Sequence, residues 1–337
     1  MTGHPRLGLA LAPGGLDLPE GRIAVFGPRE GQSLDPLPKD HVEVVSTFAP
    51  DHAYFEAQGY TCRIAPEGRY AAAVVILPRA KALARDWIAR ARAVTSGPVI
   101  VDGGKEDGIE SLLRDCRKRT NVHGPVNKAH GKLFWIAGGD FADWETPASR
   151  GPEGFVTAPG TFSADGIDPA SALLAEALPR TLGSHVIDLG AGWGYLSAQI
   201  LTRPDVTRID LVEADHTALD CARQNVTDPR AIFHWADATR WQPDLRADAV
   251  VMNPPFHTGR KAQPDLGRAF IRTAAACLKP KGTLYLVANR HLPYETQIDE
   301  TFATQEELAG TGKFKVLRAT APRQPKTPRL TRRDRLV

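Results

Sequence analysis

A short apolar run over residues 249–252 stops abruptly at the sequence Asn253-Pro254-Pro255-Phe256. Two consecutive prolines cannot continue a central β-strand, because proline lacks the backbone N–H that the sheet requires. The pattern therefore predicts a buried strand whose carboxyl end presents the Asn253 side chain. In open α/β sheets that end of a strand is where ligands bind. An amide oxygen, a proline carbonyl and an aromatic ring together suit a site that holds a planar NH2 group for alkylation.

A Gly-rich turn, Asp188-Leu189-Gly190-Ala191-Gly192-Trp193-Gly194, closes one predicted strand and opens a helix. Glycines at such a turn let backbone N–H groups approach a ligand. The position three after Gly192 is Tyr195, so the dinucleotide pattern G-x-G-x-x-G is absent. The Asp188 carboxylate would repel a phosphate but favours a cation, and S-adenosylmethionine carries a sulfonium and an ammonium group. The turn therefore predicts a site for that cofactor, with an ordinary strand–helix turn as the alternative.

Two further acidic residues end the next predicted strands. Glu213 is placed to accept both hydroxyls of a ribose, and Asp237, followed by Ala238, is placed to accept from an adenine amino group. Taken singly, either acid is as easily a helix cap or a surface charge. Acids at successive strand ends, followed by Asn253, favour one shared site and S-adenosylmethionine as its cofactor.

The chemistry expected at the proline-terminated strand is methyl transfer to a weakly nucleophilic amine. If Asn253 Oδ1 and the Pro254 carbonyl accept both hydrogens of an exocyclic amine, the nitrogen lone pair is freed to point at the methyl group. Phe256 can stack on the base. Alignment and electrostatics then do most of the catalysis, without a covalent enzyme intermediate. We assign four residues to the catalytic set: Asn253, Pro254, Pro255 and Phe256.

Basic and imidazole side chains near this motif are candidates for contact with a nucleic-acid substrate. His257 could relay the released proton, although a hydrogen-bonded loop histidine is the alternative. Arg260, Lys261 and Arg290 could hold phosphates of a splayed-out nucleotide, and solvated loop charges are the alternative.

The second half of the chain alternates predicted strands with predicted helices, which favours a doubly wound, mostly parallel α/β sheet. We expect strands over residues 186–189, 208–212, 232–235, 249–252 and 283–288, and helices over residues 169–178, 195–201, 217–225 and 266–278.

The first half repeats this rhythm, which suggests a degenerate duplication. Residues 23–27 resemble residues 186–190, Asp51 takes the place of Asp215, and Leu77 takes the place of Asn253. We therefore expect a first domain of the same fold that has lost its ligand residues. The alternative is that the similarity is only the alternation of strands and helices that any two α/β domains share. Different strand orders in the two halves would refute the duplication.

The chain length of 337 residues and a stretch rich in turn-forming residues predict two domains. A stretch dense in glycine and proline separates residues 1–145 from residues 155–320. No apolar stretch approaches the ~20 residues that span a bilayer, and the N-terminus resembles no signal peptide, so we expect a cytoplasmic protein without membrane contact. The four cysteines are scattered, and we expect free thiols and no metal site.

The end of the chain, residues 321–337, is predicted to be a basic, extended tail. From Arg323 onward it holds six basic side chains against Asp334 alone, within a chain whose net charge is +3. Interspersed prolines oppose regular structure. Such a tail is available to nucleic acid, and a solvated tail that aids solubility is the alternative.

Five motifs in order resemble the ribosomal RNA small subunit methyltransferase C family and its large-subunit sister, the guanine-N2 methyltransferases. They are residues 162–168 (FSADGID), 188–194 (DLGAGWG), 253–257 (NPPFH), 289–294 (NRHLPY) and 312–316 (GKFKV). The resemblance covers about residues 162–318. It implies two tandem Rossmann-like class I methyltransferase domains, the first degenerate, and it implies that Phe162 and Asp168 border the cofactor pocket. The chain departs from the family at Trp193, where the family usually has a small residue.

We therefore expect an S-adenosylmethionine-dependent methyltransferase that acts on N2 of a guanine in ribosomal RNA, with 16S rRNA as the expected target and S-adenosylhomocysteine as the product. Its partner would be ribosomal RNA, a ribosomal subunit or an assembly intermediate, and we expect a monomer. The cofactor residues are Phe162, Asp168, Asp188, Gly190, Gly192, Glu213, Asp237, Ala238 and Asn253. Two rival functions stay open: methylation of a glutamine amide in a translation factor, and non-catalytic RNA binding during ribosome assembly.

Overall fold

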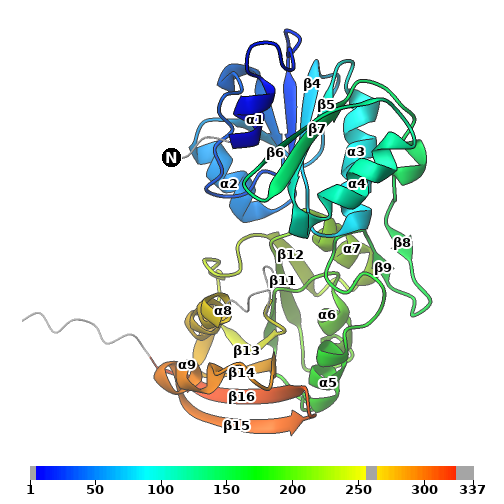
Figure 1. Ribbon diagram of the computed structural model, residues 1–337. Helices are drawn as coiled ribbons and strands as arrows, with labels where there is room; N and C mark the ends of the chain where they lie inside the picture. The colour runs from blue at the N-terminus through cyan, green and yellow to red at the C-terminus, as the bar shows by residue number, and fades with distance from the viewer. Residues whose placement is uncertain (1–4, 256–263, 324–337) are drawn as a thin grey trace, which may run out of the picture.

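The computed structural model describes residues 5–255 and 264–323, which form two α/β domains stacked one above the other (Figure 1). The first domain contains strands β1 (Ile23–Phe26), β2 (Val42–Val45), β3 (Thr61–Arg63), β4 (Ala72–Ile76), β5 (Val99–Gly104), β6 (Val122–Lys128) and β7 (Gly131–Ile136). Its helices are α1 (Pro5–Ala10), α2 (Ala49–Ala57), α3 (Lys81–Val94) and α4 (Ile109–Arg117). A two-stranded ribbon, β8 (Ser149–Arg150) and β9 (Val156–Thr157), follows it.

The second domain contains strands β10 (His185–Leu189), β11 (Arg208–Glu213), β12 (Ala231–Trp235), β13 (Ala247–Met252), β14 (Leu278–Asn289), β15 (Phe302–Gly310) and β16 (Phe314–Pro322). Its helices are α5 (Pro169–Ala177), α6 (Tyr195–Ile200), α7 (His216–Asn225), α8 (Pro264–Cys277) and α9 (Tyr294–Thr301). Every strand and helix expected in this half is present with somewhat shifted bounds. The largest shift is at β14, which begins at Leu278.

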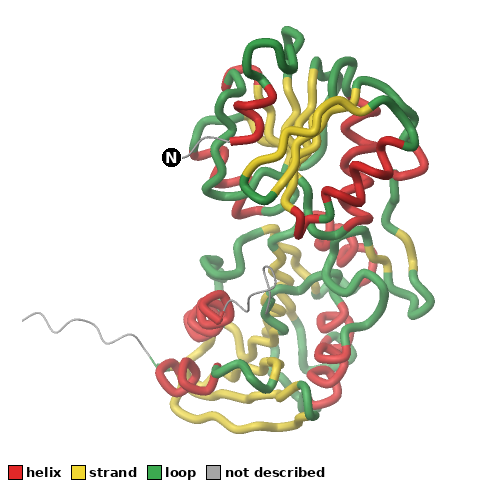
Figure 2. Tube along the Cα trace, viewed as in Figure 1, coloured by secondary structure: helices red, strands yellow, loops and turns green. Residues whose placement is uncertain are grey.

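The two sheets have the same strand order, which is the test that the duplication hypothesis had to pass. The first runs β3-β2-β1-β4-β5-β7-β6 and the second runs β12-β11-β10-β13-β14-β16-β15. In each, the last two pairings are antiparallel and the others are parallel. Helices cover both faces of each sheet (Figure 2). The predicted α/β fold with two tandem Rossmann-like domains is confirmed.

Strand β13 shows why the proline-terminated motif forms where it does. Its residues are buried except for Asp248, because the strand lies between β10 and β14 with helices on both faces. The strand ends at Met252, since Pro254 and Pro255 cannot supply the next ladder hydrogen bonds. Asn253 therefore stands at the carboxyl edge of the second sheet.

The strand register corrects two of the residue equivalences that we expected between the two halves of the chain. Gly27 and Gly190 each donate a backbone N–H to the neighbouring strand, at Val45 and Val212, so these glycines are equivalent. From this alignment the pairings of β1 with β4 and of β10 with β13 make Ile76 the counterpart of Asn253, one residue before the expected Leu77. The counterpart remains apolar.

The second correction concerns Asp215. It caps the N-terminus of α7, and the residue that stands at the same position of α2 is Phe48 instead of Asp51. Phe48 and Asp215 also form an isolated antiparallel bridge with each other. The bridge is reciprocal, since Ala49 N donates to Ala214 O at 2.8 Å and His216 N donates to Thr47 O at 2.9 Å. Equivalent residues of the two domains therefore meet across a local pseudo-twofold axis.

The last strand corrects the expected boundary of the basic tail. β16 continues to Pro322, and Arg323 donates its backbone N–H to Thr301 O and its Nε to Phe302 O. Residues 321–323 thus belong to the second domain, because an antiparallel edge pairing holds them. The remainder of the expected tail lies outside the described residues.

Within the described residues, no helix is both long and apolar enough to cross a membrane. The four cysteines are free thiols. Among residues 5–255 and 264–323, no group of three histidine, cysteine or acidic side chains is arranged to hold a metal ion.

Candidate active site

The candidate site lies at the carboxyl edge of the second sheet, where four neighbouring strands end. Asp188 lies near the end of β10, Glu213 ends β11, Asp237 follows β12 and Asn253 follows β13. These strands are adjacent in the order β12-β11-β10-β13. The fold thus places the residues singled out in the sequence along one edge, about 5 Å apart from strand to strand.

Asn253 is held by two acceptors that fix the orientation of its amide. Its Nδ2 donates to Asp168 Oδ2 at 2.9 Å and to Ser171 Oγ at 2.8 Å. Both amide hydrogens are thereby engaged, and Asn253 Oδ1 is buried without a hydrogen-bond partner in the described part of the chain. A buried acceptor left unpaired in this way costs stability, and it suits a ligand that donates an N–H.

Asp168 has its position because it caps helix α5. Its Oδ2 accepts the Ser171 backbone N–H at 2.8 Å, and Pro169 occupies the first position of the helix. The same carboxylate oxygen therefore fixes the start of α5 and the amide of Asn253. Ser171, which the sequence analysis did not single out, follows from this geometry, because it stands on the first turn of the capped helix.

Asp188 is an entirely buried carboxyl group beneath the Gly-rich turn. Its Oδ2 accepts from Ser197 Oγ at 2.7 Å, while Oδ1 has no partner among residues 5–255 and 264–323. Burial raises the pKa of Asp188 to about 7, and the nearby Glu213 carboxylate adds to the increase. A cationic ligand next to Asp188 would stabilise its ionised form and so offset the free-energy cost of burying that charge.

The turn above Asp188 requires glycine at Gly190. Its φ is +82°, and a Cβ there would lie 3.1 Å from the Phe270 ring. Gly192 N donates to Glu213 Oε2 at 2.8 Å, and Asp215 N donates to Oε1 at 2.8 Å. Burial raises the pKa of Glu213. Each of its carboxylate oxygens has a second lone-pair direction, so the pair can still accept two ribose hydroxyls.

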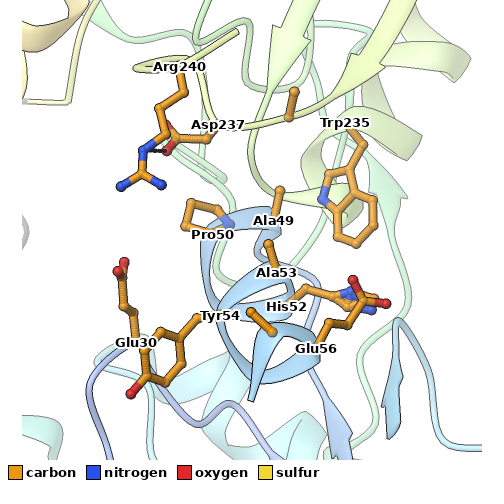
Figure 3. A pocket seen from close by; sticks show the side chains of 12 residues that line it. Glu30, Ala49, Pro50, His52, Ala53, Tyr54, Glu56, Trp235, Asp237 and Arg240 are labelled. Carbon is orange, nitrogen blue, oxygen red and sulfur yellow. Dashed lines mark ion pairs between the residues drawn. The ribbon is translucent and has the colours of Figure 1, made fainter. Parts of the chain in front are cut away.

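Asp237 borders a cavity of about 590 Å³ that lies between the domains. Its Oδ1 accepts from Thr239 N at 2.8 Å and from Thr239 Oγ1 at 2.6 Å. Its Oδ2 lies 3.7 Å from Arg240 Nε, which is too long for a hydrogen bond. Figure 3 shows Asp237 and Arg240 on one side of this cavity and residues of α2 on the other. Ala238, next in the chain, is buried in the core.

The packing of Trp193 shows how the Gly-rich turn accommodates a large side chain. The indole is 5% exposed and packs with Val156, Ala158 and Cys221 outside the turn. Its Nε1 donates to Phe162 O at 2.8 Å. The tryptophan thus anchors the loop that carries Phe162, which is 57% exposed.

Several candidates for RNA contact lie outside the described residues: Phe256, His257, Arg260 and Lys261. Arg290 is described, and it binds within the second domain. Its guanidinium pairs with Glu307 Oε1 at 2.8 Å and donates to Thr311 O at 2.8 Å. Arg290 therefore joins the end of β14 to the β15–β16 hairpin, and its role as a phosphate ligand stays a prediction.

The described residues fit S-adenosylmethionine. The unpaired Asp188 Oδ1 suits a cationic group, and the Glu213 carboxylate suits a ribose. A Cβ added at Gly192 would meet nothing within 4 Å, so the turn leaves space on its outer side. Pro254 is buried next to Asn253, and Pro255 is exposed.

Comparisons with known proteins point to the same chemistry. The family model for the methyltransferase small domain matches residues 153–318. Ribosomal RNA small subunit methyltransferase C of Salmonella newport is 37% identical over 243 residues, and the protein of that name from Salmonella paratyphi B is 33% identical over 243 residues. Each match covers 68% of this chain and 68% of the relative.

A solved structure extends the likeness to both domains. It is the T. thermophilus 16S rRNA N2 G1207 methyltransferase in complex with AdoMet and guanosine, which is 27% identical to this chain. The match has a TM-score of 0.75 and covers 90% of this chain and 88% of that one.

Proposed function

This chain belongs to the ribosomal RNA small subunit methyltransferase C family, and we propose that it transfers a methyl group from S-adenosylmethionine to the N2 amino group of a guanine in 16S ribosomal RNA. The observation that carries the proposal is the amide of Asn253, whose NH2 is bound on both hydrogens and whose Oδ1 is buried and unpaired within the described residues. Such an oxygen is a ready acceptor for an amino group.

The relatives named above distinguish this function from its rivals. Each is named for ribosomal RNA, and the solved structure is described with guanosine. The alternatives of a glutamine-amide target and of a non-catalytic assembly protein receive no support from them. We also propose that the enzyme acts as a monomer, in the compartment that holds ribosomal RNA.

In the proposed mechanism Asn253 Oδ1 and the Pro254 carbonyl accept the two hydrogens of the guanine N2. The amino group is thereby drawn out of conjugation with the ring, and its lone pair is exposed on one face. S-adenosylmethionine, when bound, supplies a methyl group on a sulfonium that leaves as a neutral thioether. The chain's own residues align the two reactants and stabilise the positive charge that develops on N2, which then loses one proton to bulk water to give the neutral methylamine.

We further propose that Asp168 and Ser171 are positioning residues in this mechanism. Because both accept from Asn253 Nδ2, they prevent the amide from flipping and presenting its NH2 to the substrate. A negatively charged acceptor also polarises the amide, which makes Oδ1 a better acceptor as charge develops on N2. Asp188 and Glu213 hold the cofactor, while Asp237 and Ala238 border its adenine end.

Replacement of Asn253 tests this assignment. Asn253→Ala should abolish methylation of 16S rRNA, because the base is no longer held, while the affinity for S-adenosylmethionine stays within about twofold. Turnover is measured with a methyl-labelled cofactor and affinity by calorimetry. Retained turnover, or loss of cofactor binding together with activity, would show that Asn253 has another role.

A further inference from the structure

The cavity between the domains has walls from both. Helix α2 of the first domain supplies the small side chains of Ala49, Pro50 and Ala53 together with larger ones, His52, Tyr54 and Glu56. The second domain supplies the segment from Trp235 to Arg240. Figure 3 shows the start of α2 facing Asp237 across the cavity. The volume of about 590 Å³ is ample for a planar heterocycle.

The first-domain wall is fixed in place by hydrogen bonds beside the ribose candidate. Ala49 N donates to the carbonyl of Ala214, the residue that directly follows Glu213. The Trp235 indole donates to the carbonyls of Thr47 at 2.9 Å and Ala214 at 2.8 Å, so it binds both domains at once. The start of α2 therefore cannot move away from the Glu213 strand end without breaking these bonds.

The chemistry of the cavity suits an adenine ring. An adenine presents two apolar faces and a donor at its 6-amino group. The cavity offers the small side chains of α2 for a face, and it offers Asp237 Oδ2, which keeps its capacity to accept. A ribose held by Glu213 would bring its base toward this side of the sheet, because β12 lies next to β11.

We infer that the first domain forms one wall of the cofactor site, and that the adenine of S-adenosylmethionine is held between α2 and the segment from Trp235 to Arg240. This inference rests on the proposed function for its choice of cofactor. The first domain, whose counterpart of Asn253 is the apolar Ile76, is then a contributor to the cofactor site of the second. Cofactor binding thereby becomes coupled to the contact between the domains.

A bulky side chain on α2 tests the inference in the full-length protein. Ala53 is exposed on the cavity wall, so Ala53→Trp should fill the cavity without disturbing the core. We expect the dissociation constants of S-adenosylhomocysteine and of adenosine, measured by calorimetry, to rise about tenfold or more. The matched control is Ala93→Trp, at an exposed alanine of α3 that does not line the cavity, and it should bind both ligands as the wild type does.

Hydrogen exchange on the unaltered protein gives a second readout that does not depend on a variant's folding. S-adenosylhomocysteine should slow exchange of the α2 amides around Ala53 as well as those of the Gly-rich turn. Equal ligand affinity in Ala53→Trp and Ala93→Trp, or unchanged exchange in α2, would overturn the inference. So would an Ala53→Trp variant that loses affinity for 16S rRNA but not for S-adenosylhomocysteine, because the cavity would then hold a base of the substrate.

A failure of the proposed function is distinguishable from a failure of this inference. In that case the wild-type protein would bind S-adenosylhomocysteine and adenosine as expected but would methylate no rRNA.

Discussion

A single carboxylate oxygen, Asp168 Oδ2, joins the fold of α5 to the orientation of Asn253. The two roles are separable by Asp168→Asn, since asparagine caps a helix about as well as aspartate does. The substitution removes the charge and keeps an acceptor. We expect kcat to fall about tenfold, because a charge-assisted hydrogen bond is stronger than a neutral one by roughly 1–1.5 kcal/mol, with KM for rRNA and cofactor affinity nearly unchanged.

The control for this variant is Asp205→Asn. Asp205 also accepts backbone N–H groups, two in its case, from Leu182 at 2.8 Å and Gly183 at 2.9 Å, but no hydrogen bond links it to Asn253. Like Asp168→Asn, it should change stability little, and it should leave kcat unchanged. A parallel loss of kcat in both variants would mean that Asp168 acts only through helix stability.

Asp188 should give cofactor binding a dependence on pH. With its pKa raised to about 7, the carboxyl is largely protonated in the free protein at pH 6, whereas a bound cation favours the ionised form. Binding then releases a proton, so affinity for S-adenosylmethionine should increase as pH rises from about 6 to 8. Calorimetry over this range should show the increase in the wild type and a flatter, weaker profile in Asp188→Asn. Identical profiles would contradict the assignment.

The same pKa has a consequence for stability. A carboxyl whose pKa is higher in the folded than in the unfolded state destabilises the fold as pH rises between those two values. Asp188→Asn cannot ionise, so above pH 7 the cofactor-free variant should resist urea better than the wild type. Asp188 would thus exchange some stability for function.

At the residue scale the sequence predicted which side chains gather at the site but not how they bind one another. Asp188, Glu213 and Asn253 follow apolar runs, and a parallel sheet brings the ends of such runs to one edge. Ser171 and Ser197 carried no such signal, because a serine on a helix gives no pattern until its distance to a carboxylate or an amide is known.

At the scale of elements, a side-chain cluster around the buried Asp210 joins three strands of the second sheet. Asp210 on β11 accepts from His185 Nε2 on β10 at 2.5 Å and from His234 Nε2 on β12 at 2.6 Å. Arg208 Nε also donates to it, at 2.8 Å. Burial alone would raise the pKa of Asp210, but these hydrogen bonds lower it well below its usual range. The stability that follows is present above the pKa of an unfolded aspartate, about 3.9, and is lost as pH falls below that value.

Asp210→Ala should therefore destabilise the second domain by about 3–5 kcal/mol near pH 7, as expected when one partner of a buried ion pair is removed. Urea unfolding followed by circular dichroism measures the change. The matched control is Asp244→Ala, which removes the exposed partner of the same Arg208 and should change stability little. Equal effects of the two substitutions would show that Asp210 contributes no more than a surface charge.

Strands buried on both faces could be predicted from the sequence, and exposed edge strands could not. β13 is an apolar run, whereas most side chains of β15 are exposed and give no alternation of apolar and polar residues. β15 forms because β16 offers it an antiparallel partner, and that pairing depends on the rest of the sheet. The partners of Arg290 could not be predicted for the same reason, since they belong to this hairpin.

At the scale of the whole molecule, the two domains meet through equivalent backbone segments, Thr47–Ala49 and Ala214–His216. The repeated rhythm of the sequence predicted two like domains, and the shared strand order agrees with it. The contact itself could not be predicted, because Phe48 and Asp215 are unlike residues whose pairing rests on backbone groups. The contact places α2 of the first domain beside the site of the second.

The identity of the methylated nucleoside tests the proposed guanine-N2 methyl transfer most sharply. Purified small and large ribosomal subunits and protein-free 16S rRNA are incubated with the protein and methyl-labelled S-adenosylmethionine, and the RNA is then digested to nucleosides and mapped. We expect label in N2-methylguanosine of 16S rRNA, and none with Asn253→Ala. Label in a ribosomal protein or a translation factor, or in an adenosine or cytidine derivative, would contradict it.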